Sequence, residues 1–357
     1  MRTVVVHDYL TQRGGAERVA LEMTRAYSTR EFVTSMYAPD RTFPEFRELD
    51  VTTLPVDRVP FLPKDPRLAL PVLGDLFRRH RIEDADLVLA SSSGFAHQVS
   101  STAPKVVYCH NPPRWLHQPE DYLPGVGAPA RLALRLVRGR LTRGDARGAG
   151  SAAGYVANSR NVADRIRRVY GIEAHVVHPP RGLEPDGPLE PVEGLPPAFL
   201  LTVGRARGYK RTGLLMEAVA GMPDLTLVTV GSDSADEWPD NIRQLVGVSD
   251  GQLRWLYRNA TALLACSRED FGLTPVEAFS HGTPVGATAE GGYLETCVDG
   301  LTGRWLDDSS PESLRTSIRR LVSEDWDRDV IRAHGEQWSP AAFHQQLADA
   351  VSGIVKA

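Results

Sequence analysis

The chain has 357 residues, and at roughly 150 residues per domain this length predicts about two domains. With 42% hydrophobic and 24% charged residues, its composition is that of a globular protein, which excludes a collagen-like or wholly disordered chain. The net charge of −4 gives no overall electrostatic reason to bind nucleic acid, so we expect no nucleic-acid partner.

In the first half of the chain, short apolar runs alternate with helix-length segments. The predicted strands are Val4–Val6, Leu87–Ala90, Val106–Tyr108 and Tyr155–Ala157, and Glu17–Tyr27 is the helix predicted after the first of them. Apolar runs this short, separated by segments of helix length, are typical of parallel strands joined by crossover helices.

The second half repeats this alternation. Its predicted strands are Phe199–Val203, Leu225–Val230, Ala262–Cys266 and Pro284–Ala287. Between the halves, the stretch from Pro179 to Pro197 holds seven prolines, which remove amide donors and stiffen the chain. We therefore predict an α/β protein with two open, doubly wound domains, residues 1–180 and 198–339, joined by a solvated linker over residues 181–197. In such sheets ligands bind at the carboxyl ends of the strands.

The sequence carries no sign of export or membrane insertion. Its N-terminus becomes polar after the three apolar residues Val4–Val6, which are too few for the apolar core of a signal peptide. No stretch of 18 uncharged apolar residues occurs, and Cys109, Cys266 and Cys297 form no C-x-x-C pair. We therefore expect a cytoplasmic protein without a disulfide framework or a zinc site.

One segment, Arg131–Arg147, is strongly basic, with six arginines and the single acidic residue Asp145. On a helix, Leu134, Val137 and Leu141 would fall on a different face from the arginines. Two interpretations stay open. The segment is either an ordinary solvated helix face, or a surface for peripheral contact with anionic lipid headgroups of the inner membrane face or with a pyrophosphate-bearing acceptor.

Two cations lie between a predicted strand and a predicted helix in the second half. Arg205 and Lys210 follow Phe199–Val203 and Gly204, and precede a helix predicted over Thr212–Val219. A helix N-terminus exposes amides and the positive end of the helix dipole, which favours an anion there. Arginine binds phosphate bidentately and lysine acts as a point charge, so the pair fits a phosphate site. On spacing alone, two solvated surface cations remain the alternative.

A second constellation runs from Glu269 to Glu277, after the predicted strand Ala262–Cys266. Pro275 suits the first turn of a helix that starts near Thr274, and we expect Glu277 in that turn and Glu269 in the preceding loop. Two such carboxylates can accept hydrogen bonds from sugar or ribose hydroxyls, while the amides around residues 272 and 273 face an anion. The alternative is a helix-stabilising charge and a solvent-exposed side chain.

Further candidates lie in the first half. His110 begins a proline-rich loop after Val106–Tyr108, where its imidazole suits acid–base chemistry, although a structural or exposed histidine is the alternative. His7 and Asp8, at the end of the first strand, have a similar standing. Gly14 and Gly15 open a helix and let backbone approach a ligand closely. The chain contains neither G-x-G-x-x-G nor G-x-x-x-x-G-K-[ST], which disfavours an NAD enzyme and a P-loop NTPase.

Together these motifs resemble the family 4 glycosyltransferases, a group of retaining nucleotide-sugar enzymes with the GT-B fold. The resemblance covers nearly the whole chain and is most specific in Ser267–Val285, which reads S-R-E-D-F-G-L-T-P-V-E-A-F-S-H-G-T-P-V. Other matching segments are His7–Leu10, Gly14–Arg18, Tyr108–Trp115, Ala157–Ser159, Gly291-Gly292 with Glu295, and Asp299–Gly303. Trp338–Pro340 and the predicted helix Ala341–Val355 resemble the C-terminal helix that returns to the first domain, so we assign residues 340–357 to it.

The resemblance implies a role for each matching residue. Arg205 and Lys210 would bind the donor diphosphate and neutralise the leaving group, so no metal and no cofactor is expected. Glu277 would hold the ribose hydroxyls, Glu269 would contact the donor hexose, and His110 would lie near the anomeric centre. The remaining residues expected to bind the donor or its nucleotide are Gly14, Gly15, Gly204, Phe271, Gly272, Leu273 and Thr274.

The resemblance also implies two Rossmann-like domains that face a central cleft, with the acceptor at residues 1–180 and the donor at residues 198–339. The pattern around His110 resembles members that act on bacterial polysaccharide or lipid-linked acceptors, often with GDP-mannose. We therefore expect transfer of a hexose from GDP-mannose or a UDP-sugar to a glycan, lipid-linked or small-molecule hydroxyl. Another GT-B activity, such as an epimerase or hydrolase of sugar nucleotides, and a non-catalytic nucleotide-sugar-binding subunit remain alternatives. The chain departs from the family pattern at Arg181-Gly182, where many members have Val-Asp, and at Arg211, where glycine is usual.

Overall fold

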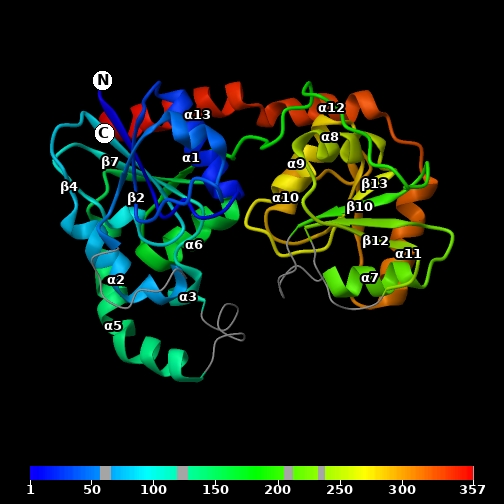
Figure 1. The fold of residues 1–357 in the computed structure, drawn as a ribbon, viewed down its shortest axis with the longest axis horizontal. Helices are drawn as coiled ribbons and strands as arrows, with labels where there is room; N and C mark the ends of the chain where they lie inside the picture. Colours follow the sequence, from blue (N-terminus) through cyan, green and yellow to red (C-terminus); the bar gives the residue numbers. More distant parts are fainter. Residues whose placement is uncertain (57–65, 119–127, 205–211, 232–237, 357) are drawn as a thin grey trace. The chain divides into compact units, whose positions relative to one another are not determined.

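A computed structural model describes residues 1–56, 66–118, 128–204, 212–231 and 238–356 (Figure 1). The chain divides into two compact units, the first made of Met1–Pro180 with Pro340–Ala357 and the second of Arg181–Ser339. Each unit is built around one parallel sheet, which confirms the predicted α/β class.

The sheet of the first unit has seven parallel strands in the order β3-β2-β1-β5-β7-β8-β9. The strands are β1 Thr3–His7, β2 Glu31–Thr34, β3 Asp50–Thr53, β5 Leu87–Ser92, β7 Lys105–Cys109, β8 Gly154–Ala157 and β9 Ala174–Val176. After β1 the chain builds one side of the sheet, and from β5 onward it builds the other side. This reversal between β1 and β5 is the place where doubly wound sheets bind ligands.

Helices flank this sheet, and the last helix of the chain is one of them. They are α1 Gly15–Ala26, α2 Pro66–Arg79, α3 Arg114–His117, α5 Ala128–Gly150, α6 Arg160–Tyr170 and α13 Pro340–Lys356, with the short 3-10 turns η1 Pro44–Glu48 and η3 Ala96–Gln98. The strands β4 Arg81–Ile82 and β6 Ser100–Ser101 form a separate pair. Helix α13 contacts α1 and β8; its label lies beside that of α1 in Figure 1. Its buried Phe343, Leu347 and Val351 join the core that contains Val5. The predicted return of the C-terminal helix to the first domain is therefore confirmed.

The sheet of the second unit has six parallel strands in the order β12-β11-β10-β13-β14-β15. The strands are β10 Leu200–Val203, β11 Leu227–Val230, β12 Ile242–Leu245, β13 Ala262–Ala265, β14 Val285–Thr288 and β15 Gly303–Leu306. The helices are α7 Thr212–Ala220, α8 Asp250–Asn259, α9 Leu273–Ser280, α10 Tyr293–Thr296, α11 Pro311–Ser323 and α12 Arg328–Gly335, followed by the 3-10 turn η5 Glu336–Trp338. Here the order reverses between β10 and β13.

Residues 181–197, which we expected to form a solvated linker, belong to the second unit; most of them are exposed or half-buried, and Arg181 and Leu183 at their start are buried. Leu183 is buried in the core of that unit. The buried Arg181 guanidinium pairs with Glu336 at 2.9 Å and with Glu184 at 3.2 Å, and its amide donates to the carbonyl of Trp338 at 2.8 Å. Arg181, where many family members have valine, therefore fastens the start of this segment to η5.

The basic segment forms one continuous helix, α5, in spite of the glycine at position 139. Gly144, Asp145, Gly148 and Ala149 form its buried side near the C-terminal end. Across the described residues, no helix combines the length and the apolar character that a membrane span requires.

Candidate functional site

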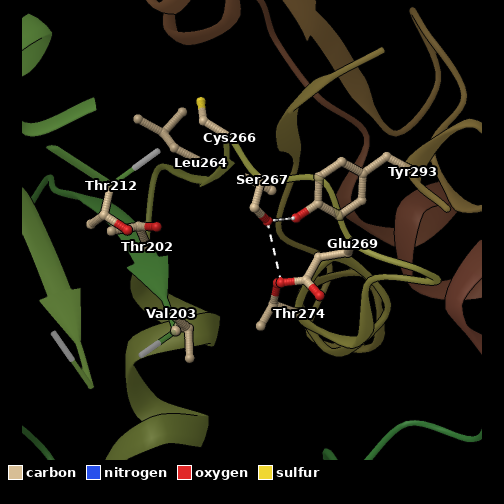
Figure 2. A pocket seen from close by; sticks show the side chains of 11 residues that line it. Thr202, Val203, Thr212, Leu264, Cys266, Ser267, Glu269, Thr274 and Tyr293 are labelled. Atoms are coloured by element: carbon tan, nitrogen blue, oxygen red, sulfur yellow. Dashed lines mark hydrogen bonds between the residues drawn. The ribbon is translucent and has the colours of Figure 1, made fainter. Parts of the chain in front are cut away.

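A pocket in the second unit opens at the carboxyl ends of β10 and β13, where the strand order reverses (Figure 2). It is lined by Thr202, Val203, Gly204, Thr212, Leu264, Ala265, Cys266, Ser267, Glu269, Thr274 and Tyr293. Five of these lining residues carry a hydroxyl group, and Glu269 carries a carboxylate. A pocket with converging polar groups above apolar strand ends suits a small ligand that carries many hydroxyls or an anionic group.

Three of the lining side chains form a hydrogen-bonded chain. The Oγ of Ser267 lies 3.3 Å from Oε1 of Glu269 and 2.6 Å from the hydroxyl of Tyr293 (Figure 2). An ionised carboxylate only accepts, so Ser267 donates its single proton to Glu269 and Tyr293 donates to Ser267. Burial, and secondarily the charge of Glu269, raises the pKa of Tyr293 well above its ordinary value, which keeps that donor protonated. This chain orients the carboxylate of Glu269 at the pocket.

Two glycines allow the loops around the pocket to pack closely. Gly272 has a φ of 93°, and a side chain there would collide with the ring of Tyr293. Gly292 has no room for a Cβ because the backbone of Phe271 lies against it, and its amide donates to the carbonyl of Glu269 at 3.0 Å. The glycines thus bring the loop of Glu269 against the segment that carries Tyr293.

Replacing Gly292 with alanine is expected to destabilise the chain by about 2–4 kcal/mol, because the added methyl group meets backbone that has no alternative rotamer. Urea unfolding of the wild type and the variant measures this difference. Gly139→Ala is the matched control: nothing surrounds this helical position, so the variant is expected to gain up to about 1 kcal/mol. Equal stability of Gly292→Ala and wild type would contradict the packing described here.

Helix α9 places its N-terminus at the pocket. Gly272 is its N-cap residue, no side chain caps the first turn, and Thr274 lines the pocket. The helix begins at Leu273, so Glu277 is its fifth residue, and our placement of this carboxylate in the first turn was wrong. Because Gly272 adopts a left-handed conformation as the N-cap residue, the helix begins one residue earlier than the start near Thr274 that Pro275 indicated.

Glu277 is held from the neighbouring helix α8. The hydroxyl of the buried Tyr257 donates to its Oε2 at 2.8 Å. Burial, together with the negative charge of Glu277, raises the pKa of Tyr257 well above its ordinary value, so the phenol remains a donor. Glu277 is not among the residues that line the pocket.

The predicted donor-binding residues of the second unit are thus partly brought together. Gly204, Glu269 and Thr274 line one pocket. Phe271 is buried in the core, with its ring against Trp338, and Leu273 packs partly on the same core. Arg205 and Lys210 lie outside the described residues. Our sequence analysis missed Thr202, Thr212, Tyr257 and Tyr293, and it read Ser267 only as part of a motif.

In the first unit, His110 follows β7 next to the reversal of the strand order. The Oγ of Ser91 lies 2.8 Å from Nε2 of His110 and 3.0 Å from Nδ1 of His7. The carboxylate of Asp8 accepts from the amides of residues 93, 95 and 96, each at 2.7 Å, and so fastens the loop after β5. The resemblance gave Asp8 no stated role, and this one is visible only in the structure.

A second buried carboxylate supports the segment after His110. Nε2 of His117, in α3, lies 2.8 Å from Asp145, and Nε2 of His97, in η3, lies 3.1 Å from it. Burial alone would raise the pKa of Asp145, but hydrogen bonds and charges from His117 and His97 outweigh burial and lower the pKa to about 2. The ionised Asp145 of α5 therefore joins the loops that follow β5 and β7.

His110 is expected to make the protein sensitive to acid. Burial, and secondarily the nearby His7, lowers the pKa of His110 from 6.5 to about 3. Below pH 6.5 the unfolded chain binds a proton that the native His110 does not, so stability falls as pH falls from about 6.5 towards 3. Between pH 6.5 and pH 4.5 this contribution changes by about 2 kcal/mol.

Urea unfolding at both pH values, for the wild type and His110→Gln, checks this expectation. The glutamine variant lacks the titrating group and should lose less stability than the wild type. An equal loss in both proteins would contradict a lowered pKa of His110 in the native protein.

The two glycines predicted to approach a ligand open helix α1. Gly14 is its N-cap residue, and the carboxylate of Glu17 occupies the space that a Cβ at Gly14 would take. Oε1 of the buried Glu17 accepts from Gln12 at 2.9 Å. The absence of a side chain at Gly14 therefore has a packing reason, besides the predicted one. Among the residues that the structure describes, no group of three or more His, Cys, Asp or Glu is arranged to hold a metal ion.

Comparison with known proteins gives two family matches that together span most of the chain. The family model described as "Glycosyl transferases group 1" matches residues 190–338, and the one described as "Glycosyltransferase Family 4" matches residues 13–186. Among curated relatives, a D-inositol 3-phosphate glycosyltransferase of Frankia alni is 32% identical over 191 residues, covering 45% of this chain and 44% of that protein. A lipopolysaccharide core biosynthesis mannosyltransferase of Rhizobium leguminosarum bv. viciae is 32% identical over 186 residues, covering 47% and 51%. The chain thus spans about half the length of the curated relatives it matches.

Among solved structures, the Anabaena protein Alr3699/HepE in complex with UDP and glucose is similar with a TM-score of 0.70. The match covers 99% of this chain and 100% of that chain, at 16% identity. At this identity the likeness concerns the fold, and it agrees with the two parallel sheets and the returning C-terminal helix described above.

Proposed function

Because this chain belongs to the group 1/family 4 glycosyltransferases and has the GT-B fold, we propose that it transfers a hexose from a nucleoside-diphosphate sugar to an acceptor hydroxyl with retention of configuration. The observation that carries this proposal is the pocket at the reversal between β10 and β13, where Glu269, Thr274 and Gly204 meet. Its hydroxyl-rich lining and the uncapped N-terminus of α9 suit the sugar and the phosphates of such a donor.

We propose that the diphosphate site consists of this pocket together with Arg205 and Lys210. Gly204 and Thr212 both line the pocket, and in sequence Arg205 follows Gly204 while Lys210 precedes Thr212 by two positions. Cleavage of the sugar–phosphate bond loads negative charge onto the departing diphosphate. Fixed cations and helix amides stabilise that charge most strongly where water is excluded, so no metal ion is needed in this proposal.

Other residues are proposed to bind the hexose, the ribose and the region of the reacting carbon. Glu269 binds hydroxyls of the hexose, and Glu277, oriented by Tyr257, binds hydroxyls of the ribose. His110 acts as a neutral hydrogen-bonding group near the reacting carbon, because its low pKa leaves it uncharged at neutral pH. In a front-face reaction the leaving phosphate takes the proton of the acceptor hydroxyl, and no protein nucleophile takes part.

For the donor we propose GDP-mannose or a UDP-sugar. The Rhizobium relative is named as a mannosyltransferase, which supports mannose as the sugar, and the Anabaena structure contains UDP and glucose, which supports a UDP-sugar. A glycan, a lipid-linked sugar or a small molecule is the proposed acceptor.

Product analysis tests the proposal. The purified chain is incubated with each candidate donor, with and without saccharide and lipid-linked acceptors, and nucleotide release and anomeric configuration are followed by NMR. We expect acceptor-dependent nucleotide release and a product with the donor's anomeric configuration. Acceptor-independent release or an epimerised donor would identify a hydrolase or an epimerase instead, and donor binding without any turnover would identify a binding subunit.

A second proposal concerns the basic helix α5. Its described arginines 135, 138, 140, 143 and 147 are exposed, and Asp75 is the acidic residue paired with Arg140. Burial, together with the positive charges of Arg147, Arg140 and Arg79, lowers the pKa of Arg78, which reflects crowding of cations between α2 and α5. We propose that this surface contacts anionic lipid headgroups.

Sedimentation with vesicles tests the contact. The wild type should bind phosphatidylglycerol vesicles in a salt-dependent manner and leave phosphatidylcholine vesicles unbound. Arg143→Glu with Arg147→Glu should weaken this binding at least about tenfold, at about 1 kcal/mol per charge. Equal sedimentation with both vesicle types, or with neither, would contradict the proposal.

A further inference from the structure

The register of the first sheet gathers three polar side chains on one face. Ser91 of β5 pairs with His7 of β1 on one side and with Tyr108 of β7 on the other. His110 lies two residues beyond Tyr108, so the alternation of strand side chains directs it to the same face as Tyr108 and Ser91. The next serine, Ser92, points to the opposite face, where its Oγ lies 3.2 Å from Nδ1 of His97.

The hydroxyl of Ser91 lies between two imidazoles. It is fully buried, 3.0 Å from Nδ1 of His7 and 2.8 Å from Nε2 of His110, and it makes no third hydrogen bond to another described residue. The rings of the two histidines lie 6.4 Å apart and nearly perpendicular, at 87°. The ring of Tyr108 packs edge-on against the imidazole of His110, with the two ring centroids 5.3 Å apart.

A hydroxyl has one proton to donate, so it donates to one histidine and accepts from the other. If His7 donates from Nδ1, Ser91 donates to Nε2 of His110, and His110 carries its own proton on Nδ1. If His110 donates from Nε2, Ser91 donates to Nδ1 of His7, and His7 carries its proton on Nε2. In both arrangements the two histidines are protonated on the like-named nitrogen, whereas mixed tautomers leave either a proton without an acceptor or two acceptors facing one proton.

We propose that His7 and Ser91 are positioning residues for His110. They hold its ring with Nε2 turned into the protein, so that only Nδ1 of His110 meets a ligand. They also couple the tautomer of His110 to that of His7. The role in transfer rests on the proposed function, whereas the tautomer coupling does not. The carboxylate of Asp8, whose charge also acts on His110, accepts hydrogen bonds from amides of the loop after β5, so the coupling runs through Ser91. The coupled pair lets His110 present either a donor or an acceptor while it remains neutral.

Long-range ¹⁵N–¹H NMR of histidine-labelled protein tests the coupling without reference to activity. The chain has ten histidines, and the signals of His7 and His110 are assigned from their disappearance in His7→Gln and His110→Gln. We expect the neutral forms of the two rings to show the same tautomer, and we expect Ser91→Ala to remove this correlation. Opposite tautomers in the wild type, or an unchanged His110 signature in Ser91→Ala, would overturn the proposal.

Two variants separate positioning from a general loss of structure. Ser92→Ala removes a neighbouring buried hydroxyl that serves another histidine, so it should leave the His110 signature unchanged. Ser91→Thr retains the hydroxyl and should restore the wild-type signature. A signature that changes as much in Ser92→Ala as in Ser91→Ala would mean that the signal reports core packing, and it would count against the proposal.

A kinetic cycle tests the link to transfer. Ser91→Ala should have a kcat/KM about tenfold lower than that of the wild type, which corresponds to about 1.4 kcal/mol. The double variant with Ser91→Ala and His110→Ala should have the same kcat/KM as His110→Ala alone. If adding Ser91→Ala to His110→Ala lowers kcat/KM by the same factor as in the otherwise wild-type chain, Ser91 does not act through His110. If His110→Ala itself leaves turnover normal, the proposed role of His110 fails, while the NMR result still decides the coupling.

Discussion

Replacing Lys210 with alanine is expected to lower kcat about 10²–10³-fold at saturating donor, and Arg205→Ala is expected to do the same. Both residues belong to the proposed diphosphate site, next in sequence to the pocket residues Gly204 and Thr212. Because the charge of the diphosphate grows as the sugar leaves, the missing cation weakens the transition state more than the bound donor. Steady-state nucleotide release, measured over a range of donor concentrations, separates kcat from KM.

Arg211→Ala is the matched control for these variants. It removes a cation adjacent to Lys210 in sequence, at a position where the family pattern has no positive charge, and it should retain near-normal turnover. Near-normal turnover in both Lys210→Ala and Arg205→Ala would show that the assignment of the diphosphate site is wrong.

Glu269→Gln is expected to lower kcat/KM about 10–100-fold, the effect of one lost hydrogen bond between a charged acceptor and a sugar hydroxyl. In the structure Glu269 lines the pocket and accepts from Ser267, which in turn accepts from Tyr293. Tyr293→Phe breaks the outer link of this chain and should cause a smaller loss, because the carboxylate itself remains. Donor-concentration series for both variants measure the two effects.

The neighbouring carboxylate provides the control. Asp270 follows Glu269 directly and is not among the residues that line the pocket, so Asp270→Asn should affect kcat/KM far less than Glu269→Gln. A larger loss of kcat/KM in Asp270→Asn than in Glu269→Gln would indicate that Asp270, rather than Glu269, contacts the sugar, and would contradict the account.

Most interior strands could be predicted because they are apolar runs; the interior strand β2, whose E-F-V-T holds only two apolar residues in a row, was missed. β1, β5, β7 and β13 are buried throughout, β10 is buried over its first two residues, and each was predicted from its run of valine, leucine or alanine. The four edge strands β3, β9, β12 and β15 were also missed. β3 and β12, for example, read D-V-T-T and I-R-Q-L and carry polar side chains that are exposed or half-buried. An edge strand buries too little surface to show an apolar run.

The site could be predicted only where its residues are contiguous in the chain. Glu269 and Thr274 fall within the most specific motif, and the structure places both at the pocket. Tyr293 could not be predicted, because it reaches Ser267 across 26 residues through the close contact of Gly292 with Phe271. The pairing of His7 with Ser91 is likewise a consequence of strand register, 84 residues apart in sequence.

The central claim is that the second unit binds a nucleoside-diphosphate sugar through this pocket. Thermal unfolding in the presence of UDP, GDP, ADP and TDP, and of their common sugars, tests it most directly, since a ligand at 100 times its Kd stabilises a protein by about 2.7 kcal/mol. We predict that one nucleotide series raises the Tm of the wild type and that this increase is reduced in both Lys210→Ala and Glu277→Ala. No increase with any nucleotide, or an equal increase in the wild type and both variants, would contradict the account.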